Sequence, residues 1–295
     1  MALLQRSTTA LGDGLRVLVH SNVFISLSTT SVAVSTVLLA NLQFDPVPFF
    51  IVFAVTMFVY SFNRLTDFAE DRQNTPGRAT FIGRYGKILL AVGIVLYLLA
   101  TGVALAREIP GAPAMAIPLI VAVLYSVVGF KRVLVVKNLL VGLSWGLIPL
   151  GVGVYYDVLW STDILFFAGF VTAMITIAAA VFDIKDIDGD SEAGIDTLPV
   201  RYGPRSTRLL AAAATALVSV VVVSFVLVGF LEPVSLVLLA FTGYVFGYSL
   251  VATPERGPLF YGFVVDGEHV FLALVLLALE FTSVLWMIPA AAFSF

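Results

Sequence analysis

The sequence predicts an all-α, polytopic membrane protein that forms one domain over residues 1–295. Three observations predict this class. Hydrophobic residues make up 60% of the chain and charged residues only 12%, whereas about 25% of the residues in a soluble domain are charged. The apolar residues occur in runs of membrane-spanning length. Nearly all charges lie between these runs. The net charge of −3 indicates no nucleic-acid partner, and the absence of cysteine excludes thiolate chemistry.

Nine segments are apolar enough to cross a bilayer, which takes about 20 residues. In order, they are Val23–Asn41, Val47–Phe62, Ile88–Ala106, Ala114–Phe130, Leu139–Tyr156, Ile164–Phe182, Leu209–Phe230, Val234–Val251 and Val270–Ile288. Before the first of them, residues 1–20 carry Arg6, Asp13 and Arg16 and no long apolar run. We therefore expect a short interfacial helix there rather than a cleaved signal peptide.

The basic residues predict how the chain is oriented. If successive connections alternate between the two sides of the membrane, 15 of the 16 basic residues fall on one side and only Arg107 lies opposite. By the positive-inside rule, the chain is a multi-pass protein of the cell membrane with a cytoplasmic N-terminus and an external C-terminus. The long connections after the second and sixth spans are then cytoplasmic.

These two connections resemble each other, which indicates a pseudo-repeat. Each begins with an acidic motif, at residues 63–71 and 183–190. Each continues to an Arg-Tyr-Gly sequence, at residues 84–86 and 201–203. The two copies lie four spans apart on the same side of the membrane, which favours a parallel duplication.

The acidic residues of both motifs have helical spacing. Asn63, Asp67 and Asp71 are four residues apart, and Asp186 and Asp190 repeat this spacing. Each set therefore lies along one helix face. Asp183, three residues before Asp186, falls on the same side as the second set. Carboxylates gathered at a membrane boundary need cations. Mg²⁺ takes oxygen ligands and completes its shell with water and substrate phosphates. The two motifs therefore predict a magnesium-dependent diphosphate site.

Basic residues near the motifs are candidates for neutralising the remaining phosphate charge. They are Arg72, Arg78, Lys131, Arg132, Lys137 and Arg201. Two alternatives stay open at this point. The acids could be solvated loop charges, or the chain could be a membrane transporter or binding protein for a phosphorylated lipid or a cation. A transporter predicts ionisable residues near the membrane midplane, where only Glu280 lies within a span.

At these residues the chain resembles the UbiA superfamily of intramembrane prenyltransferases. The first motif of that family matches Asn63, Asp67 and Asp71, and the second matches Asp186 and Asp190. The agreement extends to Asn74, Pro76 and Arg78, to Tyr125, Ser126, Lys131 and Arg132, and to Gly194, Thr197, Leu198 and Pro199. Arg64 departs from the family pattern, because an aspartate usually occupies that place.

The resemblance implies a nine-helix bundle with a central cavity and an active site on the cytoplasmic side. It implies that Asp67, Asp71, Asp186 and Asp190 are catalytic and, with Asn63, bind Mg²⁺. The residues implied to bind diphosphate are Asn63, Arg72, Arg78, Lys131, Arg132 and Arg201. An isoprenyl group would pass from an allylic isoprenyl diphosphate to a lipophilic acceptor in the lipid bilayer, releasing pyrophosphate. The acceptor stays open among an ether-lipid glycerol phosphate, a quinone precursor and a carotenoid.

Four further residues carry separate expectations. Tyr60 and Tyr125 are candidates for lining the cavity, where aromatic rings stabilise an allylic cation. We expect Glu280 to be buried in the last span, either as a structural carboxyl or as a proton acceptor. We expect His269 to lie at the membrane interface, because it flanks a span without a catalytic partner.

Overall fold

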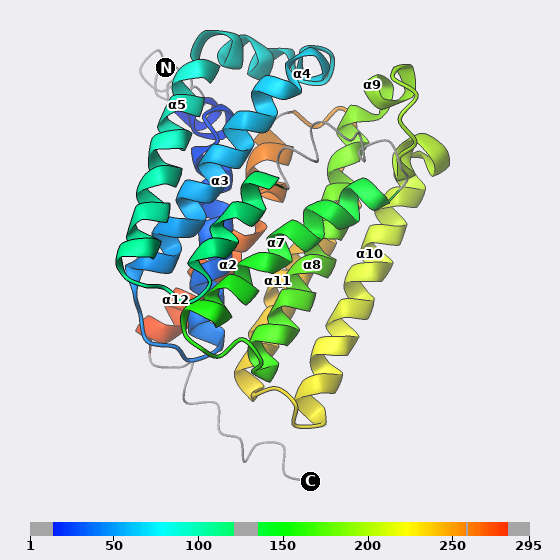
Figure 1. The fold of residues 1–295 in the computed structure, drawn as a ribbon. Coiled ribbons are helices and arrows are strands. Elements are labelled where there is room, and N and C mark those ends of the chain that lie inside the picture. Colours follow the sequence, from blue (N-terminus) through cyan, green and yellow to red (C-terminus); the bar gives the residue numbers. More distant parts are fainter. Residues whose placement is uncertain (1–13, 121–134, 258, 283–295) are drawn as a thin grey trace, which may run out of the picture.

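The computed structural model describes residues 14–120, 135–257 and 259–282. Within these ranges every regular element is a helix and none is a strand (Figure 1). The predicted all-α class is thereby confirmed. The predicted Tyr125, Lys131 and Arg132 lie outside the described residues.

The helices follow one another with short connections. In chain order they are the helix Gly14–His20, α2 (Val23–Leu39), α3 (Pro46–Thr66), α4 (Phe68–Asn74), α5 (Pro76–Ala106), η1 (Ala112–Met115), α7 (Val136–Tyr155), α8 (Thr162–Phe182), η3 (Asp183–Asp186), α9 (Ile187–Glu192), α10 (Leu198–Leu227), η4 (Pro233–Val237), α11 (Leu238–Val251), η5 (Phe260–Val265) and α12 (Glu268–Phe281). The elements η1, η3 and η4 are 3₁₀-helices and η5 is a π-helix.

Seven helices of the described chain are long and apolar enough to cross a membrane. An eighth span results if the helix Gly14–His20 and α2, which meet at 69°, are counted together. The predicted span Ala114–Phe130 begins in the described part of the chain, but residues 121–130 lie outside it. The structure therefore shows a multi-pass membrane protein, and a total of nine spans stays a prediction.

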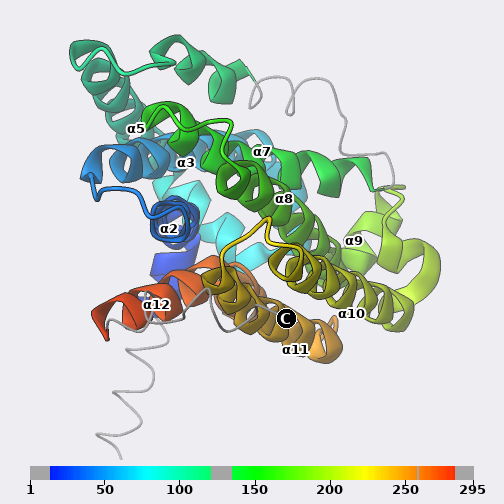
Figure 2. The same ribbon diagram turned by 90° about the horizontal axis from the view of Figure 1, so that it is seen from below.

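Helix α2 lies between α3 and α12 and also contacts α7 and α8 (Figure 2). It buries small polar residues that bond to neighbouring helices. The hydroxyl groups of Thr29 and Thr56 of α3 share a hydrogen bond of 2.8 Å, and Ser28 Oγ donates to the carbonyl oxygen of Asp266 at 2.5 Å. Such interhelical bonds stabilise membrane bundles, in which apolar residues contact lipid and protein alike.

Helices α7 and α8 pack closely because two glycines of α7 face α8. A Cβ at Gly142 would lie 2.2 Å from Thr176 Oγ1, and a Cβ at Gly146 would lie 2.1 Å from Thr172 Oγ1. Glycines four residues apart let two helix backbones approach within a membrane. This contact fixes the position of Lys137 and Asn138 near the first turn of α7 relative to the end of α8.

The two ends of the bundle differ in chemistry. The ends of α3 and α8, together with α4 and α9, form the acidic end, at the top of Figure 1. At the opposite end, the Tyr155 hydroxyl donates a 2.6 Å hydrogen bond to Asp45, which together with the Val47 N–H holds the pKa of that carboxyl below its usual value.

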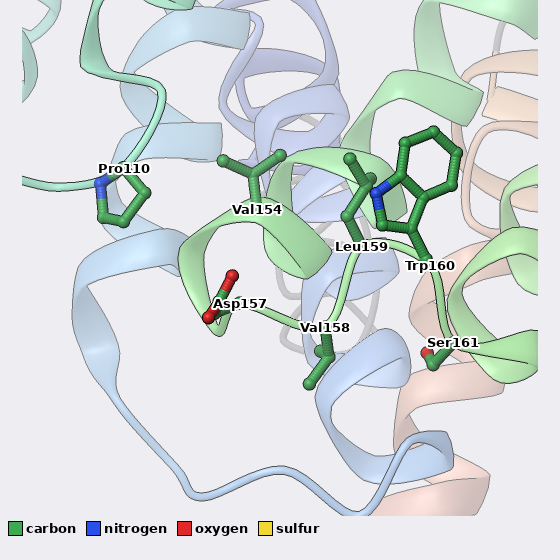
Figure 3. Close-up of a pocket in the computed structure, with 7 residues that line it drawn as sticks. All are labelled: Pro110, Val154, Asp157, Val158, Leu159, Trp160 and Ser161. Carbon is green, nitrogen blue, oxygen red and sulfur yellow. The ribbon is translucent and has the colours of Figure 1, made fainter.

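A shallow hollow also lies at this opposite end, between the turn at Pro110 and the connection from α7 to α8 (Figure 3). Val154, Val158, Leu159 and Trp160 give it a largely apolar lining. No residue of the two acidic motifs lines it, so the hollow is separate from these motifs.

Several predicted segment limits are wrong, because the sequence estimate followed only the apolar residues. Helix α5 begins at Pro76 rather than near Ile88, since its polar first turns are helical as well. Helix α10 begins at Leu198 rather than Leu209 and is interrupted at Gly203, where φ is 79° and ψ is 160°. Both long helices therefore carry the chain beyond the apolar run to the acidic end.

Two predictions about single ionisable residues of the last helix are also wrong. Glu280, expected to be buried, is exposed next to the last residue of α12. His269, expected at the interface, is 0% exposed. The physical reason is that α12 is strongly apolar around most of its circumference, so the sequence does not show which side faces the bundle.

Candidate active site

The first acidic motif spans the junction of α3 and α4. Helix α3 ends at Thr66, Asp67 has φ −95° and ψ 15°, and α4 begins at Phe68. The hydrogen-bond pattern of a helix nevertheless continues: the Asp67 N–H donates to the Asn63 carbonyl at 2.8 Å, and the Asp71 N–H donates to the Asp67 carbonyl at 3.0 Å. The three residues of the predicted motif are therefore still linked by helical backbone hydrogen bonds across the junction.

Asp71 is the buried carboxylate of this motif, with 5% of the residue exposed. Arg78 Nη2, from the first turn of α5, donates to its Oδ1 at 2.7 Å, and Arg64 Nη1 lies 3.8 Å from the same atom. The Asp71 Oδ2 atom is buried and accepts no hydrogen bond from the described residues. Arg64, which replaces the usual family aspartate, thus contributes a second cation to Asp71.

The second acidic motif begins where α8 gives way to the 3₁₀-helix η3. Asp183 is buried and binds α7: Lys137 Nζ lies 2.8 Å from its Oδ1, and Asn138 Nδ2 donates to its Oδ2 at 2.9 Å. Asp186 instead receives Lys185 Nζ at 2.6 Å and 2.5 Å on its two oxygens. The two acids of this motif therefore have different partners, and their placement on one side of the helix stays a prediction.

The two motifs meet through α4 and α9, which are in contact. A Cβ at Gly189 would lie 1.7 Å from Asn74 Oδ1, so a larger residue there would displace the Asn74 side chain. Arg78 interacts electrostatically with Asp186 as well as with Asp71. One arginine therefore pairs with the buried carboxylate of the first motif and also interacts electrostatically with a carboxylate of the second.

A third segment reaches the same place, and the sequence reasoning missed it. The π-helix η5 ends at Val265, and the half-buried Asp266 that follows interacts electrostatically with Arg64, Arg78 and Lys185. Insertions of π-helix are frequent at functional sites. The signal in the sequence is the acidic pair Asp266 and Glu268 directly before the last apolar run.

The remaining predicted residues range from buried to exposed. Asp190 is 2% exposed, and Asn63 and Asp67 are half-buried. Tyr60 lies beside the site, with its ring centroid 6.0 Å from the Arg64 guanidinium carbon. Two of the predicted diphosphate ligands are exposed. These are Arg72 and Arg201, the latter 3.5 Å from Asp196 Oδ2.

The chemistry of the donors fits Mg²⁺. They are carboxylate oxygens with one amide oxygen, and the buried Asp71 Oδ2 is an acceptor still open to a cation. Among the described residues, no three His, Asp or Glu side chains converge to form a metal site by themselves. Such an arrangement suits Mg²⁺ ions that each take one or two carboxylates and complete their shell with phosphate and water.

The fold and the site together define a helical, multi-pass membrane protein in which two aspartate motifs and their cations meet at one end of the bundle. Comparison with known proteins identifies the group. The chain belongs to the UbiA prenyltransferase family, whose sequence model matches residues 26–259. The resemblance seen in the motifs is thereby confirmed.

Solved structures share the fold at low sequence identity. A UbiA homolog from Aeropyrum pernix K1 is 17% identical, with a TM-score of 0.64 over 88% of this chain and 97% of that one. A UbiA homolog from Archaeoglobus fulgidus bound to GPP and Mg²⁺ is 15% identical, with a TM-score of 0.61 over 90% and 98%. A digeranylgeranylglyceryl phosphate synthase is 18% identical, with a TM-score of 0.53 over 92% and 98%.

A curated relative matches over a shorter range. The 2-acyl-4-prenylphloroglucinol 6-prenyltransferase of Humulus lupulus chloroplasts is 26% identical over 104 residues. The match covers 31% of this chain and 25% of the length of that relative. It agrees with the family assignment.

Proposed function

We propose that the chain is a Mg²⁺-dependent prenyltransferase of the bilayer, which transfers an isoprenyl group from an allylic isoprenyl diphosphate to a lipophilic acceptor and releases pyrophosphate. Membership of the UbiA family supports an enzyme over the alternative of a transporter or binding protein. The observation that carries the proposal is the meeting of the two motifs, in which Arg78 pairs with Asp71 and interacts with Asp186.

In this proposal Asn63, Asp67, Asp71, Asp186 and Asp190 hold Mg²⁺. When bound, Mg²⁺ neutralises the charge that develops on the departing diphosphate. A related protein of the same fold, from Archaeoglobus fulgidus, is bound to GPP and Mg²⁺, which supports both the donor class and the metal.

The cations of the chain itself bind the diphosphate and stabilise it as it leaves. Arg78 and Lys185 are the best placed, because their side chains are only 13% and 9% exposed and a buried charge is screened little by water. Arg72, Arg201, Lys131 and Arg132 complete the proposed set of ligands. Arg64 adds a charge that an aspartate at this position would not supply.

The surrounding bundle excludes water from the allylic cation, which otherwise reacts with water instead of the acceptor. We propose that nine spans enclose a central cavity lined in part by Tyr60 and Tyr125, and that the acidic end, the N-terminus and the long connections are cytoplasmic while the C-terminus is external. The acceptor is proposed to be an ether-lipid glycerol phosphate, a quinone precursor or a carotenoid.

Pyrophosphate release from the full-length chain in lipid nanodiscs tests this function. Geranyl diphosphate and longer allylic diphosphates are supplied with a lipid extract, in the presence of either Mg²⁺ or EDTA. We expect Mg²⁺-dependent release together with a new prenylated mass in the lipid fraction. A folded protein that releases no pyrophosphate from any donor, with extract and Mg²⁺ present, would contradict the proposal.

A further inference from the structure

A second group of ionisable residues lies inside the bundle, apart from the two acidic motifs. Tyr248 of α11 and the adjacent Glu268 and His269 of the first turn of α12 form this group, called here the core polar cluster. Their exposed fractions are 4%, 1% and 0%, respectively. Neither motif nor the proposed diphosphate chemistry uses these side chains.

The contacts within the cluster are incomplete. Tyr248 Oη donates to Glu268 Oε2 at 2.5 Å, which fixes the carboxyl group. The other carboxyl oxygen, Glu268 Oε1, lies 3.7 Å from His269 Nε2. That distance exceeds the range of about 2.7–3.2 Å for an N–H···O hydrogen bond.

Three buried polar atoms consequently have no hydrogen-bond partner among the described residues: Glu268 Oε1, His269 Nδ1 and His269 Nε2. The histidine ring is otherwise surrounded by aromatic rings, with centroid distances of 5.7 Å to Trp145 and 4.9 Å to Phe241. A buried polar atom without a partner is energetically unfavourable. Three such atoms in one place indicate that a polar ligand completes the cluster.

The cluster is connected to the acidic end through the start of α12. Glu268 follows the half-buried Asp266 by two residues, and Asp266 interacts with Arg64, Arg78 and Lys185. Between them, a Cβ at Gly267 would lie 2.2 Å from the Phe263 carbonyl oxygen, so the change from η5 to α12 requires a glycine. The cluster therefore follows directly, along the chain, on the segment that interacts with the cations of the acidic end.

We infer that the core polar cluster binds a hydroxyl group of the acceptor, so that the acceptor is a lipophilic alcohol or phenol. A hydroxyl oxygen placed about 2.8 Å from both Glu268 Oε1 and His269 Nε2 spans their 3.7 Å separation. It forms one hydrogen bond with the carboxyl group of Glu268 and accepts one from the N–H of the neutral imidazole. A hydrocarbon acceptor would leave both Glu268 Oε1 and His269 Nε2 without partners.

This inference rests on the proposed function, because it assumes that the chain transfers a prenyl group to an acceptor. It reduces the number of acceptor classes from three to two. A glycerol phosphate with a free hydroxyl and a phenolic quinone precursor both meet the requirement, whereas a carotenoid without a hydroxyl group does not. The related proteins named for a glyceryl phosphate and for a phloroglucinol agree with this choice of class.

Binding of a matched pair of probes tests the inference without Mg²⁺ and without a donor. Trp145 packs against His269, so its fluorescence reports occupancy in a chain carrying Trp160→Phe and Trp286→Phe. 4-Hexylphenol and hexylbenzene, which differ by the hydroxyl group, are titrated into nanodiscs. We expect 4-hexylphenol to bind at least about tenfold more tightly, and Glu268→Gln and Tyr248→Phe each to remove the difference.

Tyr244→Phe is the matched control, because it deletes a hydroxyl one turn away on α11 that donates to the Val264 carbonyl at 2.7 Å. It should keep the preference for 4-hexylphenol. Equal binding of the two probes by the unsubstituted cluster, or an unchanged preference in Glu268→Gln and Tyr248→Phe, would overturn the inference.

Failure of this inference and failure of the proposed function give different results. Mg²⁺-dependent pyrophosphate release without a preference for 4-hexylphenol would overturn the cluster assignment alone. If the preference for 4-hexylphenol requires Glu268 and Tyr248 but the protein releases no pyrophosphate, the cluster binds a hydroxyl group and the proposed prenyltransferase function is contradicted.

Discussion

The two acidic motifs have similar spacing in sequence but hold their carboxylates differently. In the first motif, Asp71 pairs with Arg78 and Arg64, each seven residues away along the chain. In the second, Asp183 pairs with Lys137 of another helix, whereas Asp186 pairs with its neighbour Lys185. The first motif is thus organised by its own segment and the second is fixed to the bundle.

This difference indicates that the carboxylates have separate tasks. Asp183 has a cation on Oδ1 and an amide on Oδ2, so both of its oxygens already have partners. Asp71 has cations on Oδ1 only, and its Oδ2 is open. We therefore expect Asp71 to act in the reaction and Asp183 to stabilise the fold, although both are acids at equivalent helix ends.

The largest effect is expected for Asp71→Asn. An amide still accepts a hydrogen bond from Arg78 but carries no charge to bind Mg²⁺, so pyrophosphate release should fall by about 10²-fold or more, comparable to losing a main electrostatic contact to a transition state. Release is measured with geranyl diphosphate at saturating Mg²⁺, per folded protein as judged by size-exclusion chromatography.

Asp188→Asn is the matched control for this prediction. Asp188 is an acid of the second motif whose side chain is exposed, so its variant should retain normal release. If Asp71→Asn and Asp188→Asn have similar activities, the distinction between the buried and the exposed carboxylates is wrong.

A smaller and different effect is expected for Asp183→Asn. The change weakens the 2.8 Å contact with the partly exposed Lys137 and should lower the free energy of unfolding by about 1–3 kcal/mol. Activity per folded molecule should stay within about tenfold, since both oxygens of Asp183 already contact α7. Unfolding in mixed micelles with increasing SDS gives the first quantity, and pyrophosphate release gives the second.

A substitution of Lys137, the partner of Asp183, provides the control. Lys137→Met in the Asp183→Asn background should add less destabilisation than Lys137→Met alone, because the pair is already broken. A loss of catalysis in Asp183→Asn that matches the loss in Asp71→Asn would show that the two motifs have the same task after all.

The fold class and the acidic motifs could be predicted because they depend on local sequence. Long apolar runs specify membrane helices wherever they lie, and a spacing of four keeps Asn63, Asp67 and Asp71 together even across the junction of α3 and α4. The resemblance to the UbiA family followed from the same residues, and the match of the family model confirms it.

The partners of these residues could not be predicted, because they depend on which helices become neighbours. The contact of Asp183 with Lys137 follows from the packing of α7 on α8, and the place of Asp266 follows from the packing of α12 on α2. The orientation of α12 about its own axis was also hidden, since its apolar residues cover most of its surface. For this reason both Glu280 and His269 were assigned to the wrong environment.

The smallest effect is expected for Arg201→Gln, which tests how far the site extends beyond the contacts of the two motifs. The Arg201 side chain is 54% exposed and lies 3.5 Å from Asp196, which is itself 44% exposed, so water and salt screen its charge. Interactions of this kind contribute about 0.2–1 kcal/mol. The KM for geranyl diphosphate should therefore rise by about threefold, with kcat unchanged and a smaller effect at high salt.

Arg78→Gln, which removes a side chain only 13% exposed, should raise KM and lower kcat. If Arg201→Gln impaired both constants as strongly as Arg78→Gln, Arg201 would leave Asp196 for the bound diphosphate, and the second motif would contribute an arginine of its own to match Arg78.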